Sequence, residues 1–253
     1  MVVMKELSDY LINKETDEII WKFAFLGRQD SLNSKLQELS ELAEEENWTS
    51  ANSDKHNNIL YSYLVHTFNR AFELGNEYVV INDDEKYACF NTGLLTENGE
   101  DIICLFNTFD SSDEYHWHLY GFRKVSDWDF LAEFSITPKV PHYFSNPADL
   151  YFDPNRELVK NLDHILDDNF SRFSESLQAK GKSYIHALLN NALDLTITKC
   201  KRNYRIVVPQ YYRGKVTYLL PVTIDDELMS LAVESINGRY RVNTIFTLDM
   251  AYK

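Results

Sequence analysis

The chain has 253 residues, of which 44% are hydrophobic and 25% charged, a composition that excludes a disordered protein and allows one large domain or two small ones. Its formal net charge of −14 excludes a surface that attracts nucleic acid everywhere, so any nucleic-acid binding must be local. Three cysteines without a C-x-x-C pair, and no stretch of about 18 apolar residues, predict a cytoplasmic protein that does not enter a membrane.

The first quarter of the chain predicts mainly helices. Residues 5–14 have the apolar spacing of a short helix, and Ser31–Glu46 that of an amphipathic helix. Between them, Ile19–Leu26 is β-branched and aromatic, which predicts a strand. Ile59–Leu74 has the clearest helical pattern and ends at Gly75, a residue that favours a left-handed helix cap.

Strands dominate the middle of the sequence. The predicted strands are Glu77–Ile81, Lys86–Phe90, Asp101–Phe106 and Tyr115–Phe122. Ser126–Phe134 predicts a short helix with its own N-cap. The stretch from Pro138 to Pro154 holds four of the six prolines, which predicts an irregular connection.

The last hundred residues predict helices followed by strands. Residues 156–172 and 181–200 are expected to be helical. Asn237-Gly238 is typical of a two-residue hairpin turn between two strands. The four closing strands are expected at Tyr204–Gln210, Val216–Val222, Leu228–Ser235 and Arg239–Leu248.

The order of these elements predicts an α+β fold, because regular alternation of strand and helix is missing. We expect a mostly antiparallel sheet of about eight strands, with an N-terminal helical block and two later helices. The chain is expected to be a single domain over residues 1–253, with residues 1–76 as a mainly helical portion packed on the sheet. The sequence contains neither G-x-G-x-x-G nor a P-loop, so a dinucleotide-binding or P-loop protein is not expected.

One stretch differs in charge from the rest of the chain. Residues 195–224 contain no Asp or Glu, and six of the 25 basic residues fall within 17 positions, where an even spread would put about two. Tyrosines are interleaved with these cations, and Arg can bind phosphate while Tyr stacks on a base. The alternative is a solvated edge whose cations pair with the excess acids. The candidate ligand-binding residues are Lys201, Arg202, Asn203, Tyr204, Gln210, Tyr211, Tyr212, Arg213 and Lys215.

Asp163 and His164 are the candidate acid–base pair. A carboxylate beside an imidazole fixes its tautomer and raises its basicity, which suits attack on or protonation of a phosphoanhydride. In a helix, Asp167 and Asp168 would lie about one turn from His164. The alternative is a histidine that only caps or solvates a helix end.

Three further groups have a functional and a structural interpretation. Asn91 ends a predicted strand in Asn-Thr-Gly and would hold an anion on backbone N–H groups, or simply form a turn. Asp249 follows a strand and would bind a ribose hydroxyl or a metal, or cap a helix. His116 and His118 share a strand face at a spacing that suits a metal, but no third ligand is specified, so ordinary packing is favoured and no metal site is assigned.

Four segments resemble a bacterial family known as domain of unknown function 3825: YACFNTGLLTENGEDI at 87–102, NLDHILDDNF at 161–170, RNYRIVVPQYYRGKVTYLLPV at 202–222 and TLDMAY at 247–252. The resemblance extends from about Trp21 to the C-terminus. Members of that family are often joined to cold-shock or other RNA-binding modules, so the resemblance implies work on or near RNA and strengthens a catalytic role for His164.

We therefore expect an RNA-processing or RNA-repair hydrolase that acts on a phosphate or phosphoanhydride group, in its sharpest form at an adenylated or capped RNA 5′ end. The expected partner is RNA or a nucleotide, and no cofactor is specified, although a divalent metal is compatible. Two alternatives stay open: a non-catalytic nucleotide- or RNA-binding module, and a protein-interaction domain that uses its tyrosine-rich surface.

Overall fold

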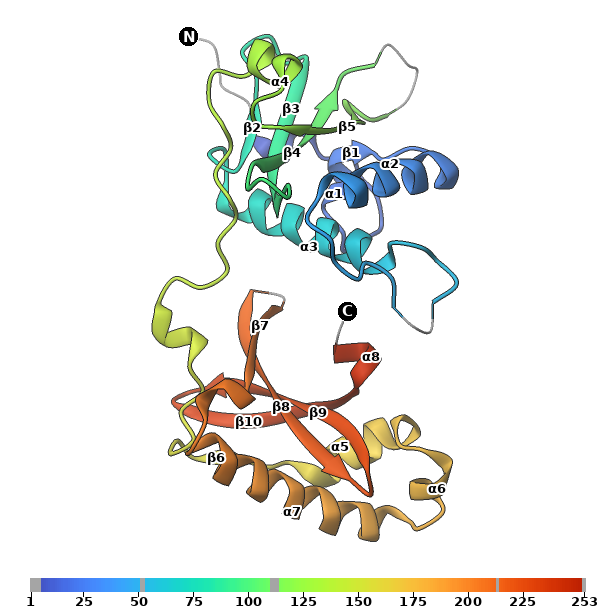
Figure 1. The fold of residues 1–253 in the computed structure, drawn as a ribbon, viewed down its shortest axis with the longest axis vertical. Helices are drawn as coiled ribbons and strands as arrows, with labels where there is room; N and C mark the ends of the chain where they lie inside the picture. The colour runs from blue at the N-terminus through green and yellow to red at the C-terminus, as the bar shows by residue number, and fades with distance from the viewer. Residues whose placement is uncertain (1–5, 51–52, 110–113, 213, 252–253) are drawn as a thin grey trace. The chain divides into compact units, whose positions relative to one another are not determined.

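The computed structural model of the chain describes residues 6–50, 53–109, 114–212 and 214–251. Its contacts fall into two compact units, residues 1–142 (unit 1) and 143–253 (unit 2), where the sequence led us to expect one domain. The mixture of helices and strands is confirmed. A single sheet of about eight strands is wrong, because the described strands form two five-stranded sheets, one in each unit (Figure 1).

Unit 1 is a five-stranded sheet with helices on it. Its strand order is β1-β5-β4-β3-β2, and all neighbours are antiparallel except the parallel pair β1 and β5. The aromatic rings of Phe68 on α3 and of Phe90 and Phe106 on the sheet form the centre of its core. The described elements are η1 (Leu7–Tyr10), α1 (Ile20–Phe23), β1 (Ala24–Phe25), α2 (Gln29–Leu42), α3 (Asn58–Leu74), β2 (Val79–Ile81), β3 (Tyr87–Leu95), β4 (Asp101–Asn107), β5 (Trp117–Lys124) and α4 (Trp128–Glu133).

The predicted strand Ile19–Leu26 is mostly wrong, since it folds as helix α1 followed by the two-residue strand β1. Ile20 and Phe23 are both fully buried, and their separation of three residues suits a helix. A short apolar run satisfies helix and strand patterns equally, so periodicity alone could not decide between them.

All three cysteines are buried in the cores. Cys89 and Cys104 belong to unit 1, and burial raises the pKa of both thiols well above the usual value. Cys200 ends a helix of unit 2, where burial again raises its pKa. These thiols are therefore protonated and act as small apolar core groups.

Unit 2 is a second five-stranded sheet, in the order β6-β10-β9-β8-β7, with only the short pair β6 and β10 parallel. Helices α5 and α7 lie side by side on one face of this sheet (Figure 1). In the described ranges, no helix combines the length and apolar character needed to cross a bilayer. The described elements are η2 (Pro147–Leu150), β6 (Leu158–Val159), α5 (Leu162–Asn169), η3 (Phe170–Arg172), α6 (Glu175–Gln178), α7 (Lys182–Cys200), η4 (Tyr204–Ile206), β7 (Val208–Tyr212), β8 (Lys215–Ile224), β9 (Glu227–Ile236), β10 (Arg239–Thr247) and α8 (Leu248–Ala251).

The predicted elements of unit 2 are confirmed except at two places. The predicted helix 156–172 begins with strand β6, and the predicted strand Tyr204–Gln210 begins with the 3-10 turn η4. Residues 202–206 therefore do not form part of a strand. The hairpin at Asn237-Gly238 is confirmed, with φ of 50° and 80° at its two central residues, as a type I′ turn requires.

Substitution of Gly93 on β3 tests how closely side chains pack around this strand in unit 1. Its φ is +73°, and an added Cβ would lie 2.9 Å from the Tyr63 hydroxyl oxygen, which donates to the Thr92 carbonyl. We expect Gly93→Ala to lower the free energy of unfolding by about 2–3 kcal/mol through combined strain and overpacking. Gly99→Ala, with φ +78° and nothing near its Cβ, should cost about 1 kcal/mol. Thermal and urea denaturation measure both, and equal destabilisation of the two variants would contradict the proposed clash.

Candidate functional site

The basic strip, defined as residues 199–215, runs from the end of α7 to the start of β8. Lys201 and Arg202 follow the last turn of the helix, and the Asn203 side chain caps the next turn by accepting the Arg205 N–H at 3.1 Å. Strand β7 then pairs with β8 in register Tyr212↔Lys215. Arg213, one of the expected phosphate-binding residues, lies outside the described residues.

The cations of the strip are exposed and have no carboxylate partner among the described residues. They are Lys199, Lys201, Arg202, Arg205 and Lys215. Four cations elsewhere in unit 2 are paired with acids: Lys160 with Asp194, Lys180 with Asp225, Lys182 with Asp167 and Arg239 with Glu157, at 2.5–3.0 Å. The alternative interpretation of the strip, in which its cations are neutralised by the chain's own acids, therefore does not fit the described contacts.

The tyrosines in the strip and just after it on β8 have three different environments. Tyr204 is 58% exposed, and its ring lies 5.9 Å from the ring of Tyr151, which is 49% exposed. The guanidinium of Arg205 lies 5.8 Å from the centre of the Tyr204 ring. Tyr211 contacts the ring of Tyr143. Tyr218 is in the core, donates to the Asp149 carbonyl, and has its pKa raised by burial to about 12.

Gln210, Tyr212 and Lys215 lie together on the face of the sheet opposite helices α5 and α7. Strand pairing places Tyr212 beside Lys215 and Gln210 beside Thr217, while the apolar residues Leu220 and Val222 of β8 face the helices. The Gln210 amide donates to the Ala251 carbonyl of α8 at 3.3 Å. Asp249 lies in the first turn of α8, where a carboxylate is favourable. Gln210 thus connects β7 to α8, and Asp249 lies at the start of that short helix.

Asp163 and His164 point to different partners. His164 Nε2 lies 3.3 Å from the carboxylate of Asp168, one turn further along α5, and both side chains are 59% exposed. Asp163 instead lies 3.5 Å from His186 Nε2 on α7. Consecutive helical residues point about 100° apart, so Asp163 cannot orient its neighbour. Of the three acids that the sequence placed near His164, namely Asp163, Asp167 and Asp168, the structure brings Asp168 to the imidazole.

The structure does not bring His164 to the basic strip. Helix α5 contacts the N-terminal half of α7: Asp163 lies against His186, and Asp167 forms an ion pair with Lys182. Lys201 follows the opposite end of α7, and a rise of 1.5 Å per residue places it about 22 Å from position 186 along the helix axis. A hollow of about 450 Å³ beside α5 is lined by Asp163, Leu166, Asp167, Lys182, Ser183 and His186.

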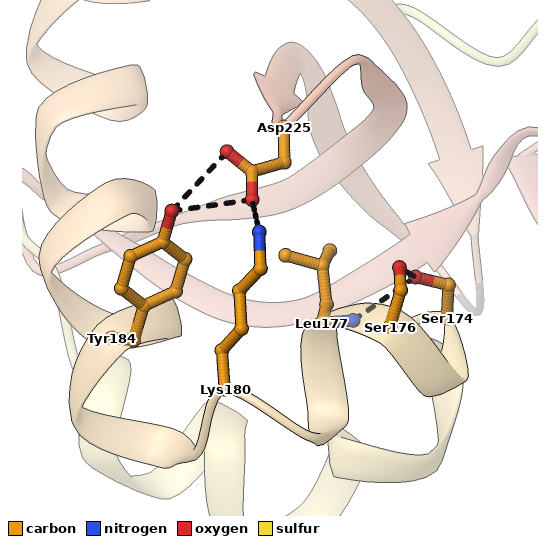
Figure 2. Close-up of polar contacts among 6 residues, drawn as sticks. All are labelled: Ser174, Ser176, Leu177, Lys180, Tyr184 and Asp225. Atoms are coloured by element: carbon orange, nitrogen blue, oxygen red, sulfur yellow. Dashed lines mark hydrogen bonds and ion pairs between the residues drawn. The ribbon is translucent and has the colours of Figure 1, made fainter.

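The N-terminal end of α7 is tied to the β8–β9 turn by a buttress of polar contacts, which Figure 2 shows. Lys180 Nζ lies 2.5 Å from Asp225 Oδ2, and the Tyr184 hydroxyl donates to the same carboxylate at 3.3 Å. The hydrogen bond from Lys180 lowers the pKa of Asp225, and the same bond raises the pKa of Lys180. The Lys180 ammonium therefore stays charged and cannot act as a base for the nearby Ser174 and Ser176, whose hydroxyls are hydrogen-bonded to each other.

The remaining candidates in unit 1 are built into its structure. Asn91 is fully buried, and its side chain accepts the Gly93 N–H at 2.9 Å and donates to Asp101 at 3.1 Å. It therefore forms a local turn rather than an open anion site. His116 packs on the ring of Trp117, and His118 on the ring of Phe25. Across the described residues, no three metal-binding side chains gather at one point.

Two exposed residues of unit 2, Tyr151 and Arg241, were not predicted from the sequence as candidate ligand-binding residues. Tyr151 lies in the proline-containing connection, where no periodicity marks it. Arg241 lies on β10, two residues after Arg239, and is exposed without a carboxylate partner in the described chain. The alternation of Arg239 and Arg241 along a predicted strand was a signal that both point to one face.

Asp225→Asn tests the buttress in Figure 2. Position 225 has a φ of +45°, which both Asp and Asn tolerate, so the substitution should leave the backbone unchanged. Folding lowers the pKa of Asp225 below its ordinary value of 3.8. The contacts of the Asp225 carboxylate therefore stabilise the fold fully at a pH above 3.8, and this stabilisation is lost as the pH falls through the lowered pKa of the folded chain. We expect a small decrease in Tm at neutral pH that vanishes in acid. Asp226→Asn in the same turn is the control, and an equal decrease in both variants would contradict a specific contact.

Comparison with known proteins places the chain in a family. A search of curated proteins found no match. The family described as "Domain of unknown function (DUF3825)" matches residues 39–253, which include most of unit 1 and all of unit 2. This match covers the basic strip, the His164–Asp168 pair and the buttress at Asp225. The chain therefore belongs to the DUF3825 family.

Proposed function

We propose that the basic strip of unit 2 binds RNA or a nucleotide ligand. The observation that carries this proposal is the division of cations in unit 2: those of the strip are exposed without carboxylate partners among the described residues, while Lys160, Lys180 and Lys182 are each paired. Cations that no acid neutralises create a local positive potential on a negative chain. Guanidinium groups such as Arg202 and Arg205 match phosphate oxygens with two parallel hydrogen bonds.

Exposed aromatic rings on the same surface favour the proposal that the ligand carries nucleobases. Tyr204 and Tyr151 expose about half of their surface and lie ring to ring at 5.9 Å. Exposed rings beside cations are typical of proteins that bind single-stranded nucleic acid, because a base can stack on a ring while the cations hold its phosphates. Arg205 beside the Tyr204 ring adds a planar cation to this platform.

A double variant tests the strip. We expect Arg202→Gln with Arg205→Gln to weaken binding of a labelled single-stranded RNA of about 12 nucleotides at about 0.1 M salt. The expected decrease in affinity is about five-fold for each phosphate that the variant no longer holds, and the salt slope should fall by about 0.7 for each such phosphate. Fluorescence anisotropy over a range of salt concentrations measures both quantities on the full chain.

The matched control removes the same number of charges from paired cations. Lys160→Gln with Lys182→Gln should change affinity much less, because Asp194 and Asp167 already neutralise those ammonium groups. If the wild-type chain binds no RNA, or if both double variants are weakened equally, the strip is not the binding surface.

Hydrolysis of a phosphate or phosphoanhydride at an RNA 5′ end is a second candidate. It is supported by the His164–Asp168 pair, in which a carboxylate 3.3 Å from the imidazole nitrogen can hold one tautomer. An exposed imidazole of this kind can accept or deliver a proton at an RNA end. Because about 22 Å along α7 separates this region from the strip, the strip would bind the body of the RNA while His164 acts on its end.

Turnover assays test this second candidate. We expect the chain to release a product from 5′-adenylated or triphosphorylated RNA, and His164→Ala to reduce the rate by about 10²–10⁴-fold, the usual contribution of an acid–base group. His186→Ala is the control, since His186 also faces an acid but was not assigned a catalytic role. Assays with and without EDTA detect a metal requirement. Absence of product, or full activity of His164→Ala, excludes the role proposed for His164.

A further inference from the structure

A hollow of about 450 Å³ lies beside strand β10, on the same end of unit 2 as the basic strip. It is lined by Val159, Ile236, Asn237, Arg239, Tyr240 and Arg241. Val159 and Ile236 expose apolar surface there, and two guanidinium groups stand beside them. The hollow therefore combines cationic and apolar side chains, and this combination suits a nucleotide, whose phosphate is anionic and whose base is flat and largely apolar.

The two arginines of this hollow differ in one respect. Strand pairing places Arg239 beside Ile236 and Arg241 beside Val159, so both point to the same face of the sheet. Arg239 Nε lies 3.0 Å from the Glu157 carboxylate. Arg241 is exposed, and the described chain gives it no carboxylate partner. Arg241 is therefore a cation of the same kind as those of the strip.

The register of the strands connects this hollow to the strip. Thr217 on β8 pairs with Glu234 on β9, and the same register two residues earlier brings Lys215 level with Ile236. Ile236 in turn pairs with Arg239 on β10. Three strand spacings of about 4.8 Å thus separate β7 from β10 along a row of exposed side chains. Glu234 is the one acid that this register places beside Arg241, and no ion pair joins the two in the described chain, so the Arg241 guanidinium stays available to a phosphate.

Helix α8 limits this row on one side. Gln210, which lies on the same face and pairs with Thr217, donates to the Ala251 carbonyl of α8. Lys215, Ile236 and Arg239 are nonetheless exposed. An accessible path therefore runs past α8 from the β7–β8 hairpin to the hollow at β10.

We infer that the ligand is single-stranded RNA and that it continues from the strip across this face of the sheet, with a phosphate on Arg241 and a base against Val159 and Ile236. This inference rests on the proposed function of the strip. Apolar side chains such as Ile236 reach a base only when it is unstacked and unpaired, whereas the bases of a duplex are hidden inside it. The row of side chains thus selects single strands over duplexes.

Arg241→Gln is the test, with Arg239→Gln as the matched control on the same strand face. In anisotropy titrations of the full chain, Arg241→Gln should weaken binding of a single-stranded RNA of about 12 nucleotides by about five-fold at about 0.1 M salt and lower the salt slope by about 0.7. It should leave a dinucleotide unchanged, because about 2 nucleotides are too short to span the roughly 14 Å from β7 to β10. Arg239→Gln should have a smaller effect, because Glu157 already neutralises Arg239. Circular dichroism checks that both variants fold.

The outcomes separate this inference from the proposed function. If Arg241→Gln binds the long RNA like wild type while the Arg202 and Arg205 variant is weakened, the path across the sheet is wrong and the strip stands. If a duplex of the same length binds as tightly as the single strand, the choice of single-stranded RNA is wrong. If the wild-type chain binds neither oligomer, the proposed function itself fails.

Discussion

Helix α7 is held on strand β8 by the burial of its apolar stripe. Ile185, Leu189 and Leu193 are fully buried in the core of unit 2 against Leu220 and other residues of the sheet. Each such side chain contributes about 1.5–3 kcal/mol on burial, so this contact holds the helix firmly on the sheet. Once α7 is fixed on the sheet, the charged groups that flank its two ends are fixed in place too, and with them the candidate sites.

The two ends of α7 consequently have different electrostatic character. At the N-terminal end, Lys180 and Lys182 meet carboxylates and their charges are cancelled locally. At the C-terminal end, the cations of the basic strip face solvent, and Arg241 on β10 joins them. In a chain with a net charge of −14, such a surface attracts anions only at short range, because at physiological salt the field is screened within about 8 Å. Binding therefore depends on direct contact more than on long-range steering.

Local signals in the sequence predicted the elements that local interactions determine. The helix ending at Gly75 and the Asn237-Gly238 hairpin are of this kind, because helix caps and I′ turns need particular residues. The division into two sheets was not predictable, since pairing between distant strands leaves little trace in one sequence. Neighbours in the sequence were also misleading: Asp163 and His164 are adjacent, yet the helix turns them toward different groups.

The buried thiols have a practical consequence for studying the two units separately. Cys89 and Cys104 lie in unit 1, and Cys200 lies in unit 2, each shielded and protonated in the folded chain. A thiol-specific reagent can modify such a group only when the surrounding core opens. The labelling rate of Cys200 thus reports the opening of one unit and that of Cys89 and Cys104 the opening of the other, so the chain carries an intrinsic chemical probe of each core.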